Sequence, residues 1–149
     1  MRRREFVAVA LGAMAWPVAA QQQFARTQDV RPLIEKLTRG RPAQQGGIEL
    51  DLPAIAENGN SVPLRVKVDS PMNEQDHVDA IHVIADRNPR SLVASFHLGP
   101  ESGRAEVQTR IRLAGSQRLT VVAELSGERF RILHQDVLVT SAACLDDSL

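Results

Sequence analysis

The sequence is poor in the residues that many binding chemistries need. Its 149 residues include a single cysteine, Cys144, no tyrosine, one tryptophan and four phenylalanines. A lone cysteine excludes an internal disulfide. So few aromatic rings exclude a stacking surface for bases or sugars, and we expect a core built from Val, Ile, Leu and Ala.

The chain also lacks an excess of charge and a long apolar run. Basic and acidic side chains balance at 18 each, and no basic patch stands out along the sequence. This argues against a nucleic-acid partner, which basic patches recognise. No apolar run reaches the roughly 20 residues that a membrane-spanning helix needs. We therefore expect neither nucleic acid nor membrane as a partner.

Residues 1–20 have the order of a secretory signal peptide. Arg2 to Arg4 form a basic region, Phe6 to Ala15 an apolar region, and small residues precede a cleavage site after Ala20. The adjacent arginines favour the twin-arginine type, and an ordinary secretory leader is the alternative. Either one predicts export to the periplasm.

The next segment, residues 21–47, contains one predicted helix. Apolar residues between Val30 and Leu37 recur at positions i, i+3, i+4 and i+7, which is one face of a helix. Asp29 is the expected N-cap and Gly40 the expected stop. A helix this short depends on packing for its stability.

Residues 48–140 predict an all-β domain. Apolar residues alternate with polar ones at a period of two, and turn signals recur every 8 to 12 residues. This pattern is typical of two packed antiparallel sheets. The expected strands cover residues 48–52, 62–68, 80–85, 92–98, 105–113, 119–125, 130–134 and 136–140.

Cys144 lies on a C-terminal arm, residues 141–149, beyond the last predicted strand. Small residues precede the cysteine, and Asp146 and Asp147 follow it. We interpret it as an exposed thiol on a short arm rather than a buried apolar residue. The two carboxylates favour the protonated thiol, so its reactivity would depend on positive charge from a partner.

Metal and catalytic readings of these residues are weaker. The four histidines show no ligand spacing, and a blue-copper site needs further ligands after the cysteine, where only five residues follow Cys144. Ser61 lies in a turn rather than in a nucleophile elbow. A thiol enzyme would need a positioned base or a second cysteine. We therefore expect no metal, no cofactor and no catalytic residue.

Several longer segments carry a resemblance to a known family, in an order maintained from about residue 27 to residue 144. They are Ile48–Pro53, Ile55–Asn60, Val62–Pro63, Val68–Met72, Ile81–Pro89, Ser102–Val107 and Thr109–Leu113. Together they resemble SoxY, the carrier subunit of thiosulfate oxidation.

The resemblance implies a fold, a function and a set of partners. The fold would be an immunoglobulin-like antiparallel β-sandwich with a short N-terminal helix, in a periplasmic carrier that is not itself an enzyme. By position, Cys144 is the attachment point for sulfur intermediates, and Ala142 and Ala143 form its arm. The family pairs with a SoxZ subunit as a heterodimer. Client enzymes would be SoxAX-like, which conjugates thiosulfate to the cysteine, and SoxB-like and SoxCD-like, which process the adduct.

The arm departs from the family pattern. The family sequence is Gly-Gly-Cys-Gly-Gly, whereas this chain has alanine at 142 and 143 and Leu145 and Asp146 after the cysteine. Alanine loses the positive-φ half of the conformations that glycine adopts, and the carboxylates repel anionic adducts. The alternative hypothesis is therefore a SoxY-like structural or interaction subunit that has lost carrier chemistry.

Overall fold

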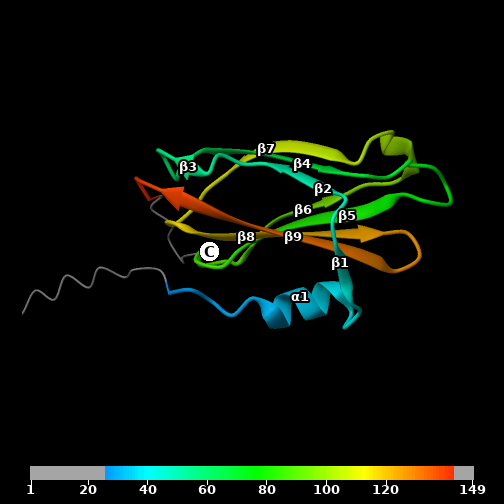
Figure 1. Cartoon of the computed structure of the whole chain (residues 1–149), viewed down its shortest axis with the longest axis horizontal. Helices are drawn as coiled ribbons and strands as arrows, with labels where there is room; N and C mark the ends of the chain where they lie inside the picture. Colours follow the sequence, from blue (N-terminus) through cyan, green and yellow to red (C-terminus); the bar gives the residue numbers. More distant parts are fainter. Residues whose placement is uncertain (1–25, 143–149) are drawn as a thin grey trace, which may run out of the picture.

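In the part of the chain that the structure describes, two β-sheets and one α-helix lie in three layers. A computed structural model of the chain describes residues 26–142. A three-stranded sheet packs on a six-stranded sheet, and the helix lies against the opposite face of the larger sheet (Figure 1). The predicted immunoglobulin-like β-sandwich with a short N-terminal helix is confirmed.

The larger sheet has the strand order β1-β9-β8-β5-β6, and β3 pairs with the far end of β9. Its central strands are antiparallel neighbours, whereas β1 and β3 run parallel to β9. The strands are β1 (Ala43–Gln45), β3 (Ile55–Ala56), β5 (Val78–Ala85), β6 (Leu92–His97), β8 (Gln117–Leu125) and β9 (Arg129–Val139).

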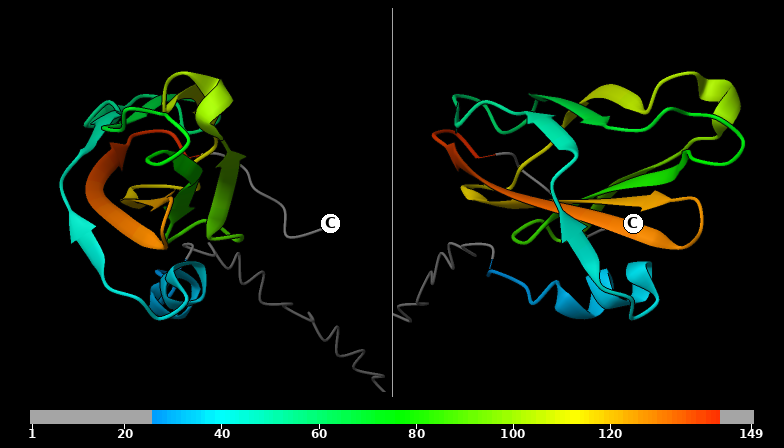
Figure 2. Two further views of the ribbon diagram at one scale, coloured as in Figure 1. Left: turned by 90° about the vertical axis from the view of Figure 1, so that its right-hand side faces the viewer. Right: turned by 45° about the vertical axis from the view of Figure 1, so that its right-hand side comes forward.

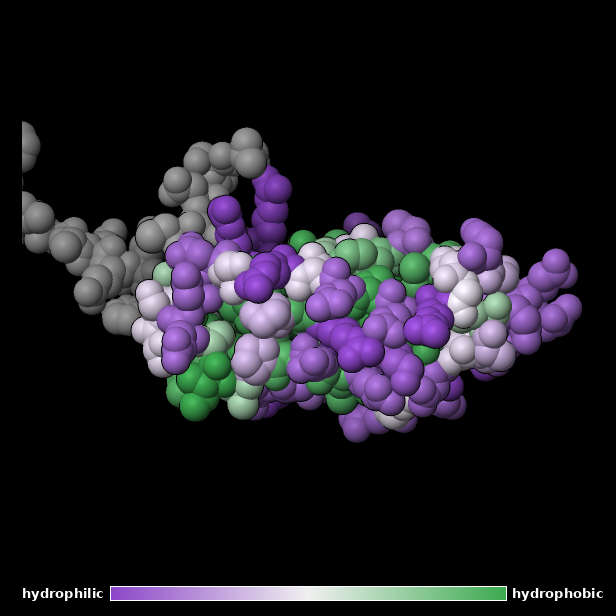
Figure 3. All heavy atoms as spheres, turned by 90° about the horizontal axis from the view of Figure 1, so that it is seen from above, coloured by the Kyte–Doolittle hydropathy of each residue, from purple (hydrophilic) through white to green (hydrophobic). Residues whose placement is uncertain are grey.

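The smaller sheet is antiparallel, with the order β2-β4-β7. Its strands are β2 (Ile48–Asp51), β4 (Val62–Val68) and β7 (Glu106–Ile111). Hydrophilic side chains dominate much of its outer face (Figure 3). Two cross-strand ion pairs lie there, Arg65 with Glu106 and Lys67 with Glu49. The outer face of the smaller sheet is therefore polar and exposed to solvent.

The core between the sheets follows from the period-two pattern. Successive side chains of a strand point to opposite faces, so the alternate residues Val62, Leu64, Val66 and Val68 of β4 are all buried. Strand β8 lies between β5 and β9 and is buried over most of its length. The nearly continuous apolar run at 119–125 reflects its central place, because both of its faces are covered.

The helix α1 (Arg31–Thr38) covers part of the outer face of the larger sheet. Its apolar stripe packs on Ile84, Val122 and Phe130, which form a second, smaller core. No helix in the described part of the chain has the length and hydropathy of a membrane span.

The predicted N-cap of this helix is wrong. The N-cap is Val30, and it makes no side-chain capping hydrogen bond. Asp29 lies one residue earlier, where its carboxylate accepts hydrogen bonds from the backbone N–H and the guanidinium of Arg31. At the other end, Arg39 adopts a left-handed conformation with φ 55° and Gly40 follows at φ 72°, as a helix stop requires.

The prediction of two separate strands at 130–134 and 136–140 is also wrong. One strand, β9, runs from Arg129 to Val139 and pairs with β8 along almost its whole length. Polar side chains in its second half suggested a break, but Asp136 points to solvent and pairs with Arg118 of β8. The short strands β1 and β3 were not predicted, because two or three residues are too few to show a period.

Candidate functional site

Residues 139–141, at and just after the end of β9, form the root of the predicted C-terminal arm, in which the sequence places Cys144. There the hydroxyl of Ser116 accepts a hydrogen bond from the backbone N–H of Val139 at 2.9 Å and lies 3.4 Å from the Val139 carbonyl. One residue later, the Thr140 N–H donates to the Ala56 carbonyl at 3.0 Å, and its hydroxyl donates to the Glu57 carbonyl at 3.1 Å. Hydrogen bonds from two different loops thus anchor the root of the arm.

Within the described residues, the anchoring extends to Ser141. Its carbonyl accepts a hydrogen bond from the N–H of the buried Gly59 at 2.7 Å, and the Gly59 carbonyl accepts one from Leu113 at 2.8 Å. Gly59 therefore ties the root of the arm to the loop that follows β7. Ala142 is exposed. The other predicted site residues, Ala143 and Cys144, lie outside the described residues, so the geometry of the predicted attachment point is not part of this site.

A shallow groove of about 490 Å³ lies beside the root of the arm. Arg118 spans part of it, with its guanidinium donating to both carboxylate oxygens of Asp136 at 2.8 and 3.2 Å. This hydrogen bonding lowers the pKa of Asp136 and raises the pKa of Arg118. The lining residues are Thr27, Ala54, Asp86, Arg87, Ser116, Gln117, Arg118, Asp136, Val137 and Leu138.

Asn88 organises the loops at this end of the sandwich. Its side chain is buried, with an exposed fraction of 5 %. The amide donates to the Arg112 carbonyl at 2.8 Å and accepts from the Ala114 N–H and the Gln117 side chain, both at 3.0 Å. The backbone carbonyl of Asn88 accepts from Gln28 at 2.7 Å. The Asn88 side chain thereby holds the loop 112–117 against the turn that follows β5, and its backbone carbonyl fastens the segment that contains Gln28 to the same turn.

Two apolar side chains close to the root of the arm are exposed to solvent. Ile55 of β3 and Leu138 of β9 are cross-strand partners, with exposed fractions of 59 % and 52 %. Exposed apolar neighbours of this kind often mark a surface that another protein covers. The patch they form is small.

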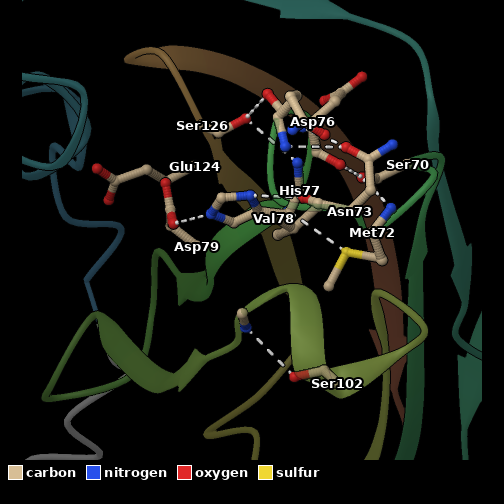
Figure 4. Close-up of polar contacts among 12 residues, drawn as sticks. Ser70, Met72, Asn73, Asp76, His77, Val78, Asp79, Ser102, Glu124 and Ser126 are labelled. Carbon is tan, nitrogen blue, oxygen red and sulfur yellow. Dashed lines mark hydrogen bonds and ion pairs between the residues drawn. The ribbon is translucent and has the colours of Figure 1, made fainter.

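His77 makes contacts within the loop that precedes β5. His77 lies between Asp79 and Asn73, with Nε2 3.0 Å from the Asp79 carboxylate and Nδ1 3.0 Å from the Asn73 carbonyl (Figure 4). The same view shows the Met72 sulfur accepting from the Val78 N–H at 3.4 Å. These contacts fold the loop that precedes β5.

His82 lies on the opposite face of β5 from the main core. Its Nδ1 is 2.8 Å from the Ser95 hydroxyl, and its ring meets that of His97 edge-on at 6.4 Å. Burial lowers its pKa, which favours the neutral ring. Within residues 26–142, no three His, Cys, Asp or Glu side chains come together as metal ligands.

The comparisons with known proteins agree on the kind of protein. The model of the family described as sulfur oxidation protein SoxY matches residues 34–144. A solved structure of the sulfur carrier protein SoxY from Chlorobium limicola f thiosulfatophilum is 31 % identical, with a TM-score of 0.60 over 73 % of this chain and 94 % of that chain. No curated protein matches the sequence.

Solved structures of low identity match the fold as well. The superoxide reductase neelaredoxin from Ignicoccus hospitalis is 13 % identical, with a TM-score of 0.56 over 63 % of this chain and 80 % of that one. A putative superoxide reductase from Thermotoga maritima is 17 % identical, with a TM-score of 0.54 over 78 % and 94 %. At these identities the likeness concerns the fold alone.

Fold and sequence therefore define an immunoglobulin-like β-sandwich, and the only cysteine of the sequence, Cys144, comes five residues after the end of its last strand. The chain belongs to the SoxY family of sulfur oxidation proteins.

Sequence reasoning missed the residues that organise the loops at this end of the sandwich. Asn88 was interpreted only as part of a turn, and Ser116 likewise. Asn followed by Pro does mark a turn, but no local pattern says that the asparagine side chain is buried. Their partners lie more than 20 residues away in the sequence.

Proposed function

We propose that this chain is a periplasmic, non-catalytic carrier that holds sulfur intermediates of thiosulfate oxidation on Cys144 while partner enzymes process them. Its partners would be a SoxZ-like subunit in a heterodimer and, transiently, SoxAX-like, SoxB-like and SoxCD-like enzymes. The proposal needs no metal and no cofactor other than the covalent sulfur adduct.

The observation that carries this proposal is the anchored root of the arm. Backbone hydrogen bonds hold the chain as far as Ser141 at an exposed end of the sandwich. The only cysteine of the sequence follows three residues later, and three residues span at most about 10 Å. A rigid base and a short reach suit a group that has to be presented to several enzymes in turn.

Loading of thiosulfate would be an oxidation. The Cys144 thiolate and the outer sulfur of thiosulfate form an S–S bond, which gives a cysteine S-thiosulfonate, and the two electrons released pass to the SoxAX-like enzyme, which acts as the oxidant. The product carries one negative charge. Asp146 and Asp147 lie two and three positions beyond the cysteine, and their repulsion would slow loading relative to a glycine arm.

A second candidate function follows from the same two aspartates. A SoxY-like structural or interaction subunit would keep the sandwich and the partner but would not carry sulfur. The alanines at 142 and 143 and the acidic residues after Cys144 favour it, since they restrict the arm and repel anions.

Intact-mass spectrometry of protein purified from periplasm of cells that oxidise thiosulfate separates the two candidates. We expect a mass increase that reduction removes, and we expect it to be absent from Cys144→Ser. A matched variant, Ser141→Ala, alters the arm without touching the thiol and should carry the same adduct as the wild type.

An unmodified wild-type mass, with the SoxZ-like subunit still bound, would refute the carrier and support the interaction subunit. Equal loading of Cys144→Ser would refute the assignment of the attachment point.

A further inference from the structure

The edges of the two sheets are protected unequally. An unpaired sheet edge invites another strand, and proteins block it with short strands or charged residues. Strands β1 and β3 have three and two residues. Strand β2 carries Glu49 and Asp51, and β7 carries Glu106 and Arg110.

Strand β6 has neither form of protection. It is six residues long, and its sequence, Leu-Val-Ala-Ser-Phe-His, contains no Asp, Glu, Lys or Arg. It ends the larger sheet, where it pairs with β5 on one side only. The left view of Figure 2 shows it as the outermost strand on one side of the sandwich. Among the strands that the structure describes, β6 is the open edge.

The hydrogen-bonding groups of this edge can be assigned from the register. The Leu98 N–H donates to the Asp79 carbonyl of β5 at 2.9 Å. Residues of an antiparallel strand face its neighbour alternately, so Phe96 also faces β5. The backbone N–H and carbonyl groups of Ser95 and His97 therefore point away from the sheet.

Apolar side chains accompany these free backbone groups. Val93, Phe96 and Leu98 pack against the main core, but each stays only half-buried. Val107 of β7, on the same flank of the sandwich, is half-buried too. Phe96 is one of two aromatic residues in the described chain, and a partly exposed aromatic ring is a frequent anchor of protein interfaces.

We propose that the β6 edge is where the second subunit docks, by adding one of its own edge strands to the larger sheet. This inference rests on the proposed function, which supplies a SoxZ-like β-sandwich subunit. The chemistry of β6 calls for an extended, uncharged strand that pairs with Ser95 and His97 and covers the half-buried side chains. Strand addition of this kind gains its affinity from backbone hydrogen bonds and its specificity from alternate side chains.

Hydrogen–deuterium exchange tests this edge in the unmodified chain. The probe is the SoxZ subunit of the same organism, co-expressed and purified with the chain. In the complex, the amides of Ser95 and His97 should exchange at least about tenfold more slowly than in the free chain, because an opening that costs roughly 1.4 kcal/mol more is tenfold rarer. The amides of Gln108 and Arg110, which face outward on β7, should not change.

Three variants measure the contribution of the edge to affinity. Ser95→Pro removes the outward N–H and leaves the bonds to β5, and proline is tolerated on an edge strand. Ser95→Ala removes only the hydroxyl that contacts His82. Gln108→Pro makes the same backbone change on β7. The Ala105 carbonyl bonds to β4, so by alternation the Gln108 N–H points away from β4 and its loss breaks no bond within the sheet.

Binding of SoxZ should weaken by about tenfold or more, the equivalent of roughly 1.4 kcal/mol, in Ser95→Pro alone. Circular dichroism identifies a variant that fails to fold, and in that event the exchange experiment decides alone.

The outcomes separate this inference from the proposed function. A wild-type complex in which β6 amides stay unprotected and Ser95→Pro binds normally overturns the docking edge but leaves the carrier intact. Protection of β6 in a dimer of this chain alone overturns the choice of partner. Absence of any complex with SoxZ overturns both this inference and the partner proposed above.

Discussion

Ser116 and Val139 are joined through one hydroxyl group, which accepts the Val139 N–H at 2.9 Å and lies 3.4 Å from the Val139 carbonyl. Ser116 belongs to the loop before β8, and Val139 is the last residue of β9. The pair therefore fastens the end of the last strand to the body of the sandwich, immediately before the arm begins.

Removing that hydroxyl should loosen the root of the arm. We expect Ser116→Ala to lower the free energy of unfolding by about 1 kcal/mol. This is the net contribution of one hydrogen bond, and the Val139 N–H loses its hydrogen-bond acceptor in the variant. Urea denaturation measures this. The control is Ser141→Ala, an exposed serine near the same root, which should change stability by less than about 0.5 kcal/mol. Equal losses in the two variants would contradict the role given to Ser116.

Truncating the buried Asn88 should cost more. Asn88→Ala leaves the Arg112 carbonyl, the Ala114 N–H and the Gln117 amide without this partner. We expect a loss of about 3 kcal/mol, since each unsatisfied buried group costs roughly 1 to 3 kcal/mol and water replaces some bonds. Thermal or urea unfolding reports it. Asn60→Ala, at an exposed asparagine in another turn, should leave stability nearly unchanged. A comparable loss in that variant would refute the role given to Asn88 in organising the loops.

The Arg118–Asp136 pair predicts a pH dependence. The hydrogen bonds from Arg118 hold the pKa of Asp136 below its ordinary value. A carboxylate with a lowered folded-state pKa contributes stability above its unfolded pKa and loses it as pH falls through the folded pKa. Arg118→Ala should therefore raise the pKa of Asp136. The variant should be less stable than the wild type above the unfolded pKa of the carboxyl group, and the two free energies of unfolding should converge as the pH falls through the folded pKa.

Carboxyl NMR titration measures that pKa directly. The control is Arg110→Ala, whose guanidinium contacts Ser61 and, among the residues that the structure describes, no carboxylate. It should leave the titration of Asp136 unchanged. A normal Asp136 pKa in the wild-type protein would show that the exposed pair does not form in solution.

Gly47 and Gly40 provide a matched test of a close approach. Both have similar positive φ angles, 68° and 72°. A Cβ at Gly40 would meet nothing within 4 Å, whereas one at Gly47 would collide with the guanidinium of Arg131. That guanidinium donates to the carbonyls of Gly47 at 3.2 Å and Asp69 at 3.0 Å.

Both alanine variants should therefore lose stability through backbone strain of roughly 1 kcal/mol, and Gly47→Ala should lose about 1 kcal/mol more as Arg131 is displaced. Chemical denaturation of the two variants gives the comparison. An equal loss in both would mean that Arg131 swings aside at no cost.

The fold class could be read from the sequence because it depends on local periodicity. The alternation from Val62 to Val68 predicted a half-buried strand, and the structure has β4 over those residues. The helical stripe between Val30 and Leu37 predicted a helix, which the structure starts at Arg31. In both cases a single element needs only its own residues to present an apolar face.

The prediction was poorer where an element depends on a partner. Strands β1 and β3 exist only because β9 offers them backbone groups, with Ala43 opposite Phe130 and Ile55 opposite Leu138. The continuity of β9 through Gln135 and Asp136 likewise depends on its pairing with β8. Pairs this far apart in sequence leave no local pattern.

The sequence by itself determined which residues of the longer strands face inward, and that its only cysteine, Cys144, follows the last strand. Only the tertiary structure decided that Ser116 bonds to the root of the arm, that Asn88 holds the loop in which Ser116 lies, and that β6 ends its sheet without a charged residue. Periodicity acts within one element, where burial of one face is enough. Side-chain hydrogen bonds and sheet edges depend on which distant segments become neighbours, and strand pairing sets that only when the whole chain folds.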